Sequence, residues 1–222
     1  MSQSTSFDER SLTDGGPSAP SLQVVPDWMD AARGLAARFE EVTGRSPSRS
    51  LAVARDLAAK LGLAGPELGL LEWSVALYDV GMLSVPGDVV GKGGCLDGGD
   101  LAHIRRHPTA SAEMILRISS SLAPVAAAAR SHHEHWDGRG YPDGLSGHEI
   151  PLHGRILALA DTYDALTSFR PLRQGVFTDS AVREYFMAES GKRFDPSLVS
   201  AFLGPHADDE RRSARALRRR KA

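Results

Sequence analysis

The chain has little cysteine, no long apolar run and almost none of the alternating, valine-rich pattern that predicts strands. Its 222 residues include a single cysteine, Cys95. This excludes a disulfide within the chain and fits a reducing compartment. No apolar stretch approaches the roughly 20 residues that a membrane-spanning helix needs. The opening MSQSTSFDER has neither a basic cluster nor an apolar core, so we expect no secretory signal. The expectation is a cytoplasmic chain without a membrane span.

The composition predicts one globular domain between two polar ends. Hydrophobic residues make up 41% of the chain and charged residues 24%, which is ordinary for a globular protein. Residues 1–26 are rich in Ser, Gly and Pro, so we expect a disordered N-terminal segment there. The domain is expected over 27–205, and a basic C-terminal tail over 206–222. The stretch RRSARALRRRKA in this tail has no acidic residue. Contact with nucleic acid or anionic lipid is one interpretation, but a solvated terminus is the favoured one.

Helical periodicity dominates the domain. Apolar residues recur at intervals of three and four, and Gly, Pro, Ser and Asp mark the ends of the segments. The segment 65–81 is apolar on most faces, which indicates a buried central helix, and a Gly- and Pro-rich loop is expected over 81–99. The fold class is therefore all-α, a single helical bundle. The expected helices cover 27–44, 46–62, 65–81, 100–107, 108–118, 122–132, 156–166, 179–190 and 195–203.

Two adjacent histidines begin the most unusual stretch, HHEHWDGRGYPDG. His132 ends a predicted helix and His133 follows it. Neighbouring residues on a helix point about 100° apart, but at a helix end both imidazoles can turn inward. Neutral imidazole is a common ligand of divalent transition metals. Glu134 and Asp137 are candidates to orient the two rings.

The remainder of this stretch predicts a loop of special shape. Gly138 and Gly140 allow backbone angles that other residues rarely adopt, and Pro142 stiffens the exit from the loop. On the residues alone, an exposed histidine pair followed by ordinary turns remains an equally open interpretation.

The longer segment HHEHWDGRGYPDGLSGHEIPLHGRILALADTYDALTSFRPLR resembles the HD-GYP family, a branch of the HD-domain metal-dependent phosphohydrolases. The family signature HHExxDGxGYP matches at every fixed position from His132 to Pro142. The similarity continues in RRHP and in GKRFDPSLVSAF. The resemblance implies an all-helical fold and metal-assisted hydrolysis of cyclic dinucleotides, mainly cyclic di-GMP, with two or three bound metal ions that are often iron. The signature loop, here called the GYP loop, contains Asp137, Gly138, Gly140, Tyr141 and Pro142.

The resemblance also implies roles for individual residues. Metal ligands fall on Asp79, His107, His132, His133 and Asp161. Of these, Asp79, His132 and His133 are also the expected catalytic residues. Arg170 and Arg173 match positions that hold the substrate phosphates, a task that suits the two-pronged guanidinium. Asp164 matches a position beside these arginines, where it would orient them.

The pattern is broken in the stretch ALYDVGM. The histidine of the family's His-Asp dyad is replaced by Tyr78, and its lysine by Met82. Farther upstream, a glutamate and a histidine of the family fall on Val42 and Ser46. These losses lie on one half of the metal cluster. We therefore expect one tight site for a divalent transition metal, iron or manganese, and a depleted second site.

Two functions of different classes follow. The favoured one is a cyclic di-GMP phosphodiesterase with a depleted metal site and reduced activity. The other is a catalytically inactive HD-GYP-like signalling module that binds a cyclic dinucleotide or a partner protein. GGDEF-type diguanylate cyclase domains, contacting the GYP loop, are the partners that the resemblance implies, and a homodimer is a further expectation. A hydrolase of another phosphoester is a third, less favoured interpretation.

Overall fold

The computed structural model describes residues 27–90, 92, 96–168 and 177–204. The predicted N-terminal segment, the basic tail, Arg170 and Arg173 lie outside these residues. Ten α-helices occur in the described part: α1 (Trp28–Thr43), α2 (Ser48–Leu61), α3 (Gly65–Leu77), α4 (Gly87–Val90), α5 (Gly98–Ile104), α6 (His107–Ile118), α7 (Ala123–Ser131), α8 (Leu152–Thr167), α9 (Asp179–Glu189) and α10 (Pro196–Leu203). Three 3-10 helices accompany them: η1 (Val80–Ser84), η2 (Ser120–Leu122) and η3 (Gly147–Glu149).

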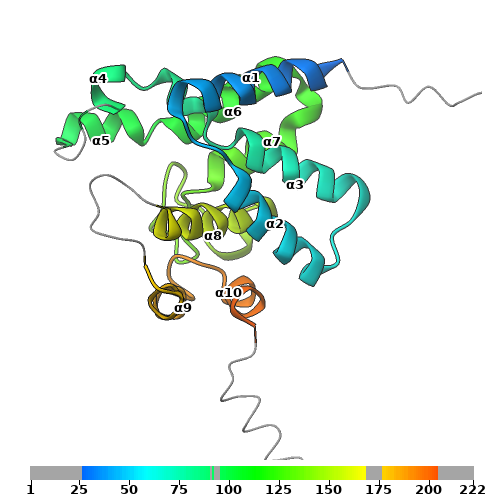
Figure 1. The fold of residues 1–222 in the computed structure, drawn as a ribbon, viewed down its shortest axis with the longest axis vertical. Coiled ribbons are helices and arrows are strands. Elements are labelled where there is room, and N and C mark those ends of the chain that lie inside the picture. Colours follow the sequence, from blue (N-terminus) through cyan, green and yellow to red (C-terminus); the bar gives the residue numbers. More distant parts are fainter. Residues whose placement is uncertain (1–26, 91, 93–95, 169–176, 205–222) are drawn as a thin grey trace, which may run out of the picture.

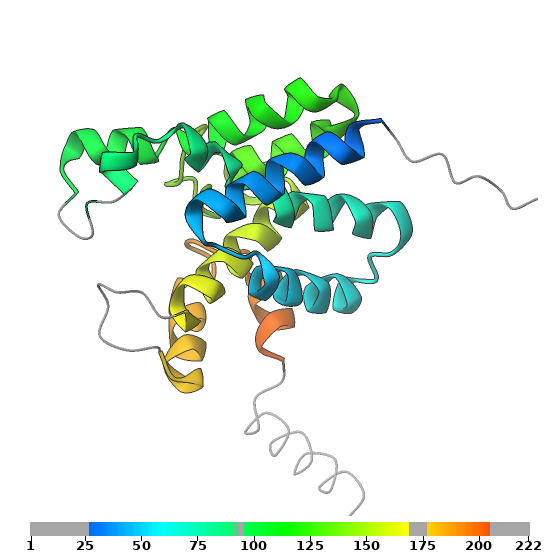
Figure 2. The same cartoon turned by 45° about the horizontal axis from the view of Figure 1, so that its top comes forward.

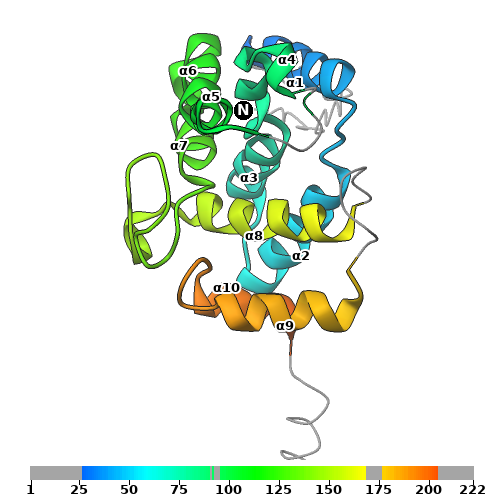
Figure 3. The ribbon, with the colours of Figure 1, turned by 90° about the vertical axis from the view of Figure 1, so that its left-hand side faces the viewer.

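Helix α8 runs through the middle of the bundle (Figure 1). It packs against α2 and α7, and α9 and α10 lie on its other side (Figure 3). Helices α6 and α7 pack against each other, and α3 contacts α7. The short helices α4 and α5 extend to one side (Figure 2). The loop that follows α7 lies between three elements, which are α7, α8 and the turn that joins α9 to α10.

The apolar face of each helix explains this arrangement. Helix α8 buries Ile156, Leu157 and Leu159, which stand on more than one face because it has neighbours on both sides. Leu57 of α2 and Leu71 of α3 are fully buried in the same core. At roughly 25 cal/mol for each Å² of apolar surface removed from water, such side chains supply most of the favourable free energy of folding.

The all-helical fold is confirmed. Within the described ranges between residues 27 and 204, the only β pairing consists of two isolated bridges. No helix in this part is long and apolar enough to span a bilayer. Three local predictions were wrong. Helix α3 ends at Leu77, not at Gly81, and the expected loop over 81–99 contains η1 and α4. The expected helix start at residue 46 was too early, because α2 begins at Ser48.

Gly81 fixes the distance between η1 and α6. Its amide donates to the Ser111 hydroxyl at 2.8 Å. A Cβ atom at Gly81 would lie 2.1 Å from the carbonyl oxygen of His107 and 2.6 Å from the backbone nitrogen of Ser111. Only a residue without a side chain fits this contact. Because Asp79 stands just before η1 and His107 begins α6, the contact also brings these two side chains together.

We predict that Gly81→Ala lowers the free energy of unfolding by about 2–4 kcal/mol, because the new methyl group meets backbone atoms that cannot move aside. Gly69→Ala is the matched control. It lies inside α3 with no atom within 4 Å of the added Cβ, so it should raise stability by about 0.5–1 kcal/mol. Urea denaturation measures both changes. Equal midpoints for the two variants would contradict the close contact.

Candidate metal centre

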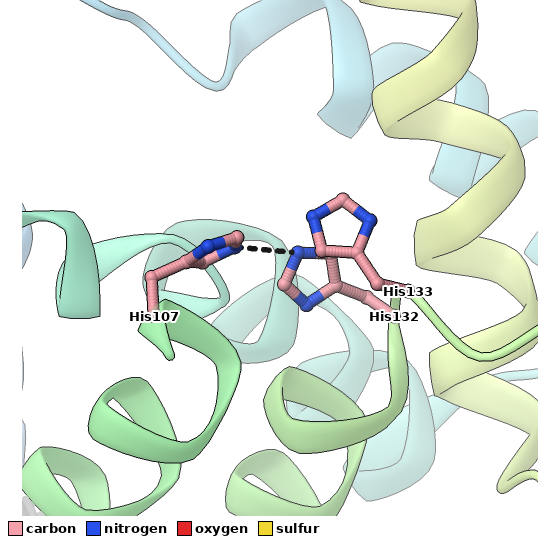
Figure 4. Close-up of side chains that lie close together, drawn as sticks. All are labelled: His107, His132 and His133. Atoms are coloured by element: carbon pink, nitrogen blue, oxygen red, sulfur yellow. Dashed lines mark hydrogen bonds between the residues drawn. The ribbon is translucent and has the colours of Figure 1, made fainter. Parts of the chain in front are cut away.

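Three histidines from two helix ends meet inside the bundle (Figure 4). His107 is the first residue of α6, His132 caps the C-terminus of α7, and His133 comes next. One ring nitrogen of each lies within 4.8 Å of the others. His107 and His132 are buried, and His133 is partly buried. Convergent imidazoles of this kind are typical ligands of divalent transition metals.

The hydrogen bonds of these rings indicate that a metal ion fits between them. The Nδ1 atoms of His107 and His132 lie 2.7 Å and 2.6 Å from the carbonyl oxygens of Ile104 and Ala129. A carbonyl oxygen only accepts, so Nδ1 donates and a neutral ring leaves Nε2 as an acceptor. The two Nε2 atoms are 3.2 Å apart, and Asp79 Oδ1 lies 3.1 Å and 4.0 Å from them. With both rings neutral, three acceptors face one another. A divalent cation would satisfy all three.

The protonation states agree with this donor set. Burial lowers the pKa of His132 to about 4, outweighing the attraction of the Asp79 carboxylate. Burial, together with the two neighbouring imidazoles, also lowers the pKa of His133. Burial alone would raise the pKa of Asp79, but the neighbouring His107 ring and the charge of Arg45 hold this pKa well below its usual range. Near neutral pH His132 and His133 are therefore neutral and lie beside an ionised carboxylate, as metal binding requires.

The opposite side of Asp79 faces a cation from the chain itself. Arg45 lies in the connection between α1 and α2, and its Nη1 is 2.5 Å from Asp79 Oδ2. Its Nη2 is 3.6 Å from Asp161 Oδ1, which also accepts a 3.0 Å hydrogen bond from the Tyr78 hydroxyl. Burial, and then the charges of Asp161 and Asp79, raise the pKa of Tyr78 well above its usual value. Tyr78 is therefore a neutral donor here.

Tyr141 of the GYP loop covers the outer face of His133. The two rings stack with centroids 4.9 Å apart and an interplanar angle of 24°. The Tyr141 amide donates to the His133 carbonyl oxygen at 3.2 Å, and the Arg105 guanidinium lies 5.4 Å from the centre of the Tyr141 ring. Burial raises the pKa of Tyr141 to about 12. The loop thus fixes the orientation of one imidazole by direct contact.

Glu134 shapes the loop and does not orient the histidine rings. Its side chain is buried, and Oε1 accepts from the amides of Asp143 and Gly144 at 2.6 Å and 3.1 Å. The expectation that Glu134 holds the imidazoles was wrong. Backbone carbonyls do this for His107 and His132, a type of contact that sequence patterns do not reveal. Asp137 accepts from the amide of Arg139 at 3.1 Å, so its carboxylate also serves the loop.

The GYP loop is tied to the turn between α9 and α10. The amide of Trp136 donates to the carbonyl oxygen of Arg193 at 3.2 Å, and the amide of Asp137 donates to that of Lys192 at 2.8 Å. Asp137 also forms an isolated antiparallel bridge with Ser146. Two segments about 55 residues apart in the sequence are joined in this way, so the C-terminal helices help to position the histidines.

The two loop glycines are needed for different reasons. Gly138 has a φ of 80°, the left-handed conformation that was expected. Gly140 does not adopt a positive φ; instead, a Cβ atom there would lie 2.4 Å from Cα of Glu134. The prediction of unusual backbone angles is therefore confirmed for Gly138 and wrong for Gly140. The peptide bond between Tyr141 and Pro142 is cis.

Comparison with known proteins identifies the family to which this arrangement belongs. The HD domain family matches residues 32–198, which is most of the chain. The chain belongs to the HD domain family. Within that family it is an HD-GYP member, as the signature from His132 to Pro142 predicted. HD domains are metal-dependent, and the described residues hold a histidine cluster that can bind a metal ion.

Similar curated HD-GYP proteins act on cyclic dinucleotides. The 3'3'-cGAMP-specific phosphodiesterase 2 of Vibrio cholerae is 38% identical over 173 residues, which are 78% of this chain and 33% of the relative. The cyclic di-GMP phosphodiesterase response regulator RpfG of Xanthomonas campestris is 39% identical over 159 residues, which are 71% of this chain and 42% of the relative. The chain thus spans between a third and about two fifths of the length of these relatives.

Solved structures show the same fold. A cyclic GMP-AMP specific phosphodiesterase of V. cholerae, V-cGAP3, superposes with a TM-score of 0.57 at 24% identity, covering 78% of this chain and 47% of that one. The HDG"Y"P protein Bd1817 from Bdellovibrio bacteriovorus also has a TM-score of 0.57, at 18% identity, covering 79% of this chain and 62% of that one. These similarities concern the HD fold alone.

The predicted site residues of this HD-GYP chain divide into two groups. His107, His132, His133 and Asp79 lie together, whereas Asp161 contacts Arg45 and Tyr78. The roles of these five residues as metal ligands stay predictions. The phosphate-binding roles of Arg170 and Arg173, which lie outside the described residues, also stay predictions. Asp164 accepts from the Ser168 hydroxyl at 2.8 Å.

Sequence reasoning missed two basic residues of the site. Arg45 pairs with Asp79, and Arg49 donates to the Thr167 carbonyl oxygen at 3.1 Å and to the Ser168 hydroxyl at 2.7 Å. One signal for Arg45 was present. It directly precedes Ser46, the position where the resemblance places a histidine, so a cation stands next to a position where a metal ligand was expected.

We predict that Glu134→Ala increases hydrogen exchange at the amides of Asp143 and Gly144 by at least about tenfold, because both lose a charged acceptor in a buried place. Hydrogen exchange followed by mass spectrometry or NMR measures this. Glu149→Ala is the matched control, since Glu149 is an exposed carboxylate that accepts from Ser146 in the same loop. It should leave the two amides unchanged. Equal exchange in both variants would show that Glu134 does not hold the loop.

Proposed function

We propose that this domain is a metal-dependent phosphodiesterase that hydrolyses a phosphodiester bond of a cyclic dinucleotide, cyclic di-GMP or 3'3'-cGAMP. One observation carries the proposal. The Nε2 atoms of His107 and His132 and the Oδ1 atom of Asp79 face one another as acceptors, and His133 lies beside them. The activities for which the relatives are named support the substrate class. The chain spans less than half of those relatives, so activity and substrate are proposed for the domain itself.

Asp79, His107, His132 and His133 would hold one divalent ion, for which iron and manganese are the proposed metals. When bound, such an ion polarises a phosphoryl oxygen and lowers the pKa of water. The carbonyl oxygens of Ile104 and Ala129 keep two of the imidazoles turned so that Nε2 faces the site.

The substrate phosphates would lie on the side of the site from which the chain continues beyond α8. Arg170 and Arg173 are the proposed phosphate ligands there. Arg49 and Asp164 meet at the hydroxyl of Ser168, the last described residue before them. These contacts would fix the start of the arginine-bearing segment and so help to position its cations.

A second candidate function is a signalling module that binds a cyclic dinucleotide without cleaving it. The observation in its favour is the replacement beside Asp161, where Tyr78 and Arg45 occupy the carboxylate oxygen that the family resemblance gives to a metal. GGDEF-type cyclase domains contacting the GYP loop, a homodimer and a cytoplasmic location remain predictions from the sequence.

We predict that protein purified without oxygen and supplied with Mn²⁺ or Fe²⁺ converts cyclic di-GMP or 3'3'-cGAMP to a linear dinucleotide, detected by liquid chromatography. His132→Ala should lower the rate at least a hundredfold, because it removes an imidazole that the metal ion needs. His148→Ala is the matched control. His148 contacts Trp136 outside the cluster and should leave the rate unchanged.

The two candidate functions give different results in this experiment. If the wild type forms no more product than His132→Ala, the phosphodiesterase is ruled out. In that case, nucleotide binding measured by calorimetry would support the signalling module. If neither turnover nor binding is seen with both nucleotides, both candidates fail.

A further inference from the structure

Arg45 is held beside the cluster by the end of α1. Helix α1 closes at Gly44, whose φ of 65° turns the chain sharply. The amide of Arg45 then donates to the Thr43 hydroxyl at 3.2 Å, and that hydroxyl donates to the Phe39 carbonyl oxygen at 2.7 Å. The arginine backbone is therefore part of the helix cap. Its side chain points from this cap towards Asp79 and Asp161.

Asp79 divides its carboxylate between two kinds of partner. Oδ1 faces the imidazoles of His107 and His132, and Oδ2 faces Arg45. Its side chain is only 7% exposed, so the charge needs compensation on both sides. Asp161 shares the second side, since its Oδ1 lies near the guanidinium and accepts from Tyr78. The pair of carboxylates thus has a histidine side and an arginine side.

We propose that the Arg45 guanidinium is a built-in cation between Asp79 and Asp161, and that it restricts the site to one metal ion per chain. The proposal rests on the metal site of the proposed function. Two carboxylates without the arginine would carry two negative charges and could hold a second divalent ion between them. With the arginine in place, Asp79 Oδ2 is already paired, and the Tyr78 hydroxyl donates to Asp161 Oδ1.

Arg45 competes with a second metal ion for the Asp79 carboxylate. The Arg45 guanidinium lies against the carboxylates of Asp79 and Asp161, and both favour its charged form. A guanidinium does not lose its proton in proteins, whereas a lysine at a buried site can. A second divalent ion would have to displace the guanidinium from Asp79 or bind beside a fixed positive charge. Both alternatives are unfavourable at the short distances found here.

Metal counting on a set of four proteins tests this inference. Chelator-treated protein is dialysed against Mn²⁺, and bound metal per chain is measured by mass spectrometry, with electron paramagnetic resonance to detect coupled manganese pairs. Wild type should bind one ion. Tyr78→His adds an imidazole next to Asp161 but keeps the arginine, so it should still bind one. Arg45→Ser combined with Tyr78→His should bind two and show a coupled-pair signal.

The fourth protein is the matched control, Arg38→Ser combined with Tyr78→His. Arg38 also pairs with a carboxylate, Glu41, but on the exposed face of α1, so this protein should bind one ion. Tyr78→His alone binding two ions would overturn the inference, because the arginine would not exclude the second ion. The inference also fails if the Arg45→Ser double variant, folded by circular dichroism, binds one ion, or if the wild type binds none or two.

These readouts are independent of turnover. A wild type that binds one ion but does not hydrolyse cyclic dinucleotides would leave the arginine inference standing and would remove the proposed phosphodiesterase. The single variant Arg45→Ser guards against misfolding of the double variant. It should bind a second Mn²⁺ at least about tenfold more tightly than wild type does, and an unchanged affinity would contradict the proposal.

Discussion

The buried carboxylate of Asp79 is the interaction around which the site is organised. A carboxylate in the interior is unfavourable unless charges or hydrogen bonds compensate it, and here imidazoles do so on one side and a guanidinium on the other. The compensating groups come from the start of α6, the end of α7 and the connection after α1. The ionised Asp79 carboxylate therefore depends on the correct packing of helices that are distant in the sequence. The close contact at Gly81 sets the distance between η1 and α6.

The surroundings of this carboxylate also account for Asp161. Without donors or a cation beside them, two carboxylates would face each other with little compensation. Arg45 and Tyr78 supply a positive charge and a neutral donor at that place. The roles of Tyr78 and Arg45 are best understood together. Each satisfies Asp161, and neither requires a metal ion to do so.

Much of the fold and half of the site could be predicted from the sequence, because periodicity and a long signature are local signals. The apolar pattern of α8 and the histidine pair after α7 are examples. The partners of Arg45 could not be assigned, since they lie 34 and 116 positions away and a lone arginine after a helix has no periodicity. Glu134 was misjudged for a related reason. A buried acid next to two histidines looks like their partner, and only the folded loop reveals that it binds backbone amides.

The attachment of the GYP loop to the turn at Lys192 and Arg193 has a consequence for how this domain can be shortened or joined to others. A protein cut after α8 would keep every histidine of the cluster yet lose the backbone acceptors that anchor Trp136 and Asp137. On the C-terminal side, a fusion junction or proteolytic trimming must therefore leave the turn between α9 and α10 in place. Mechanical strain applied to that last pair of helices, by a tether or by a neighbouring module, would be transmitted to the stacked rings of Tyr141 and His133.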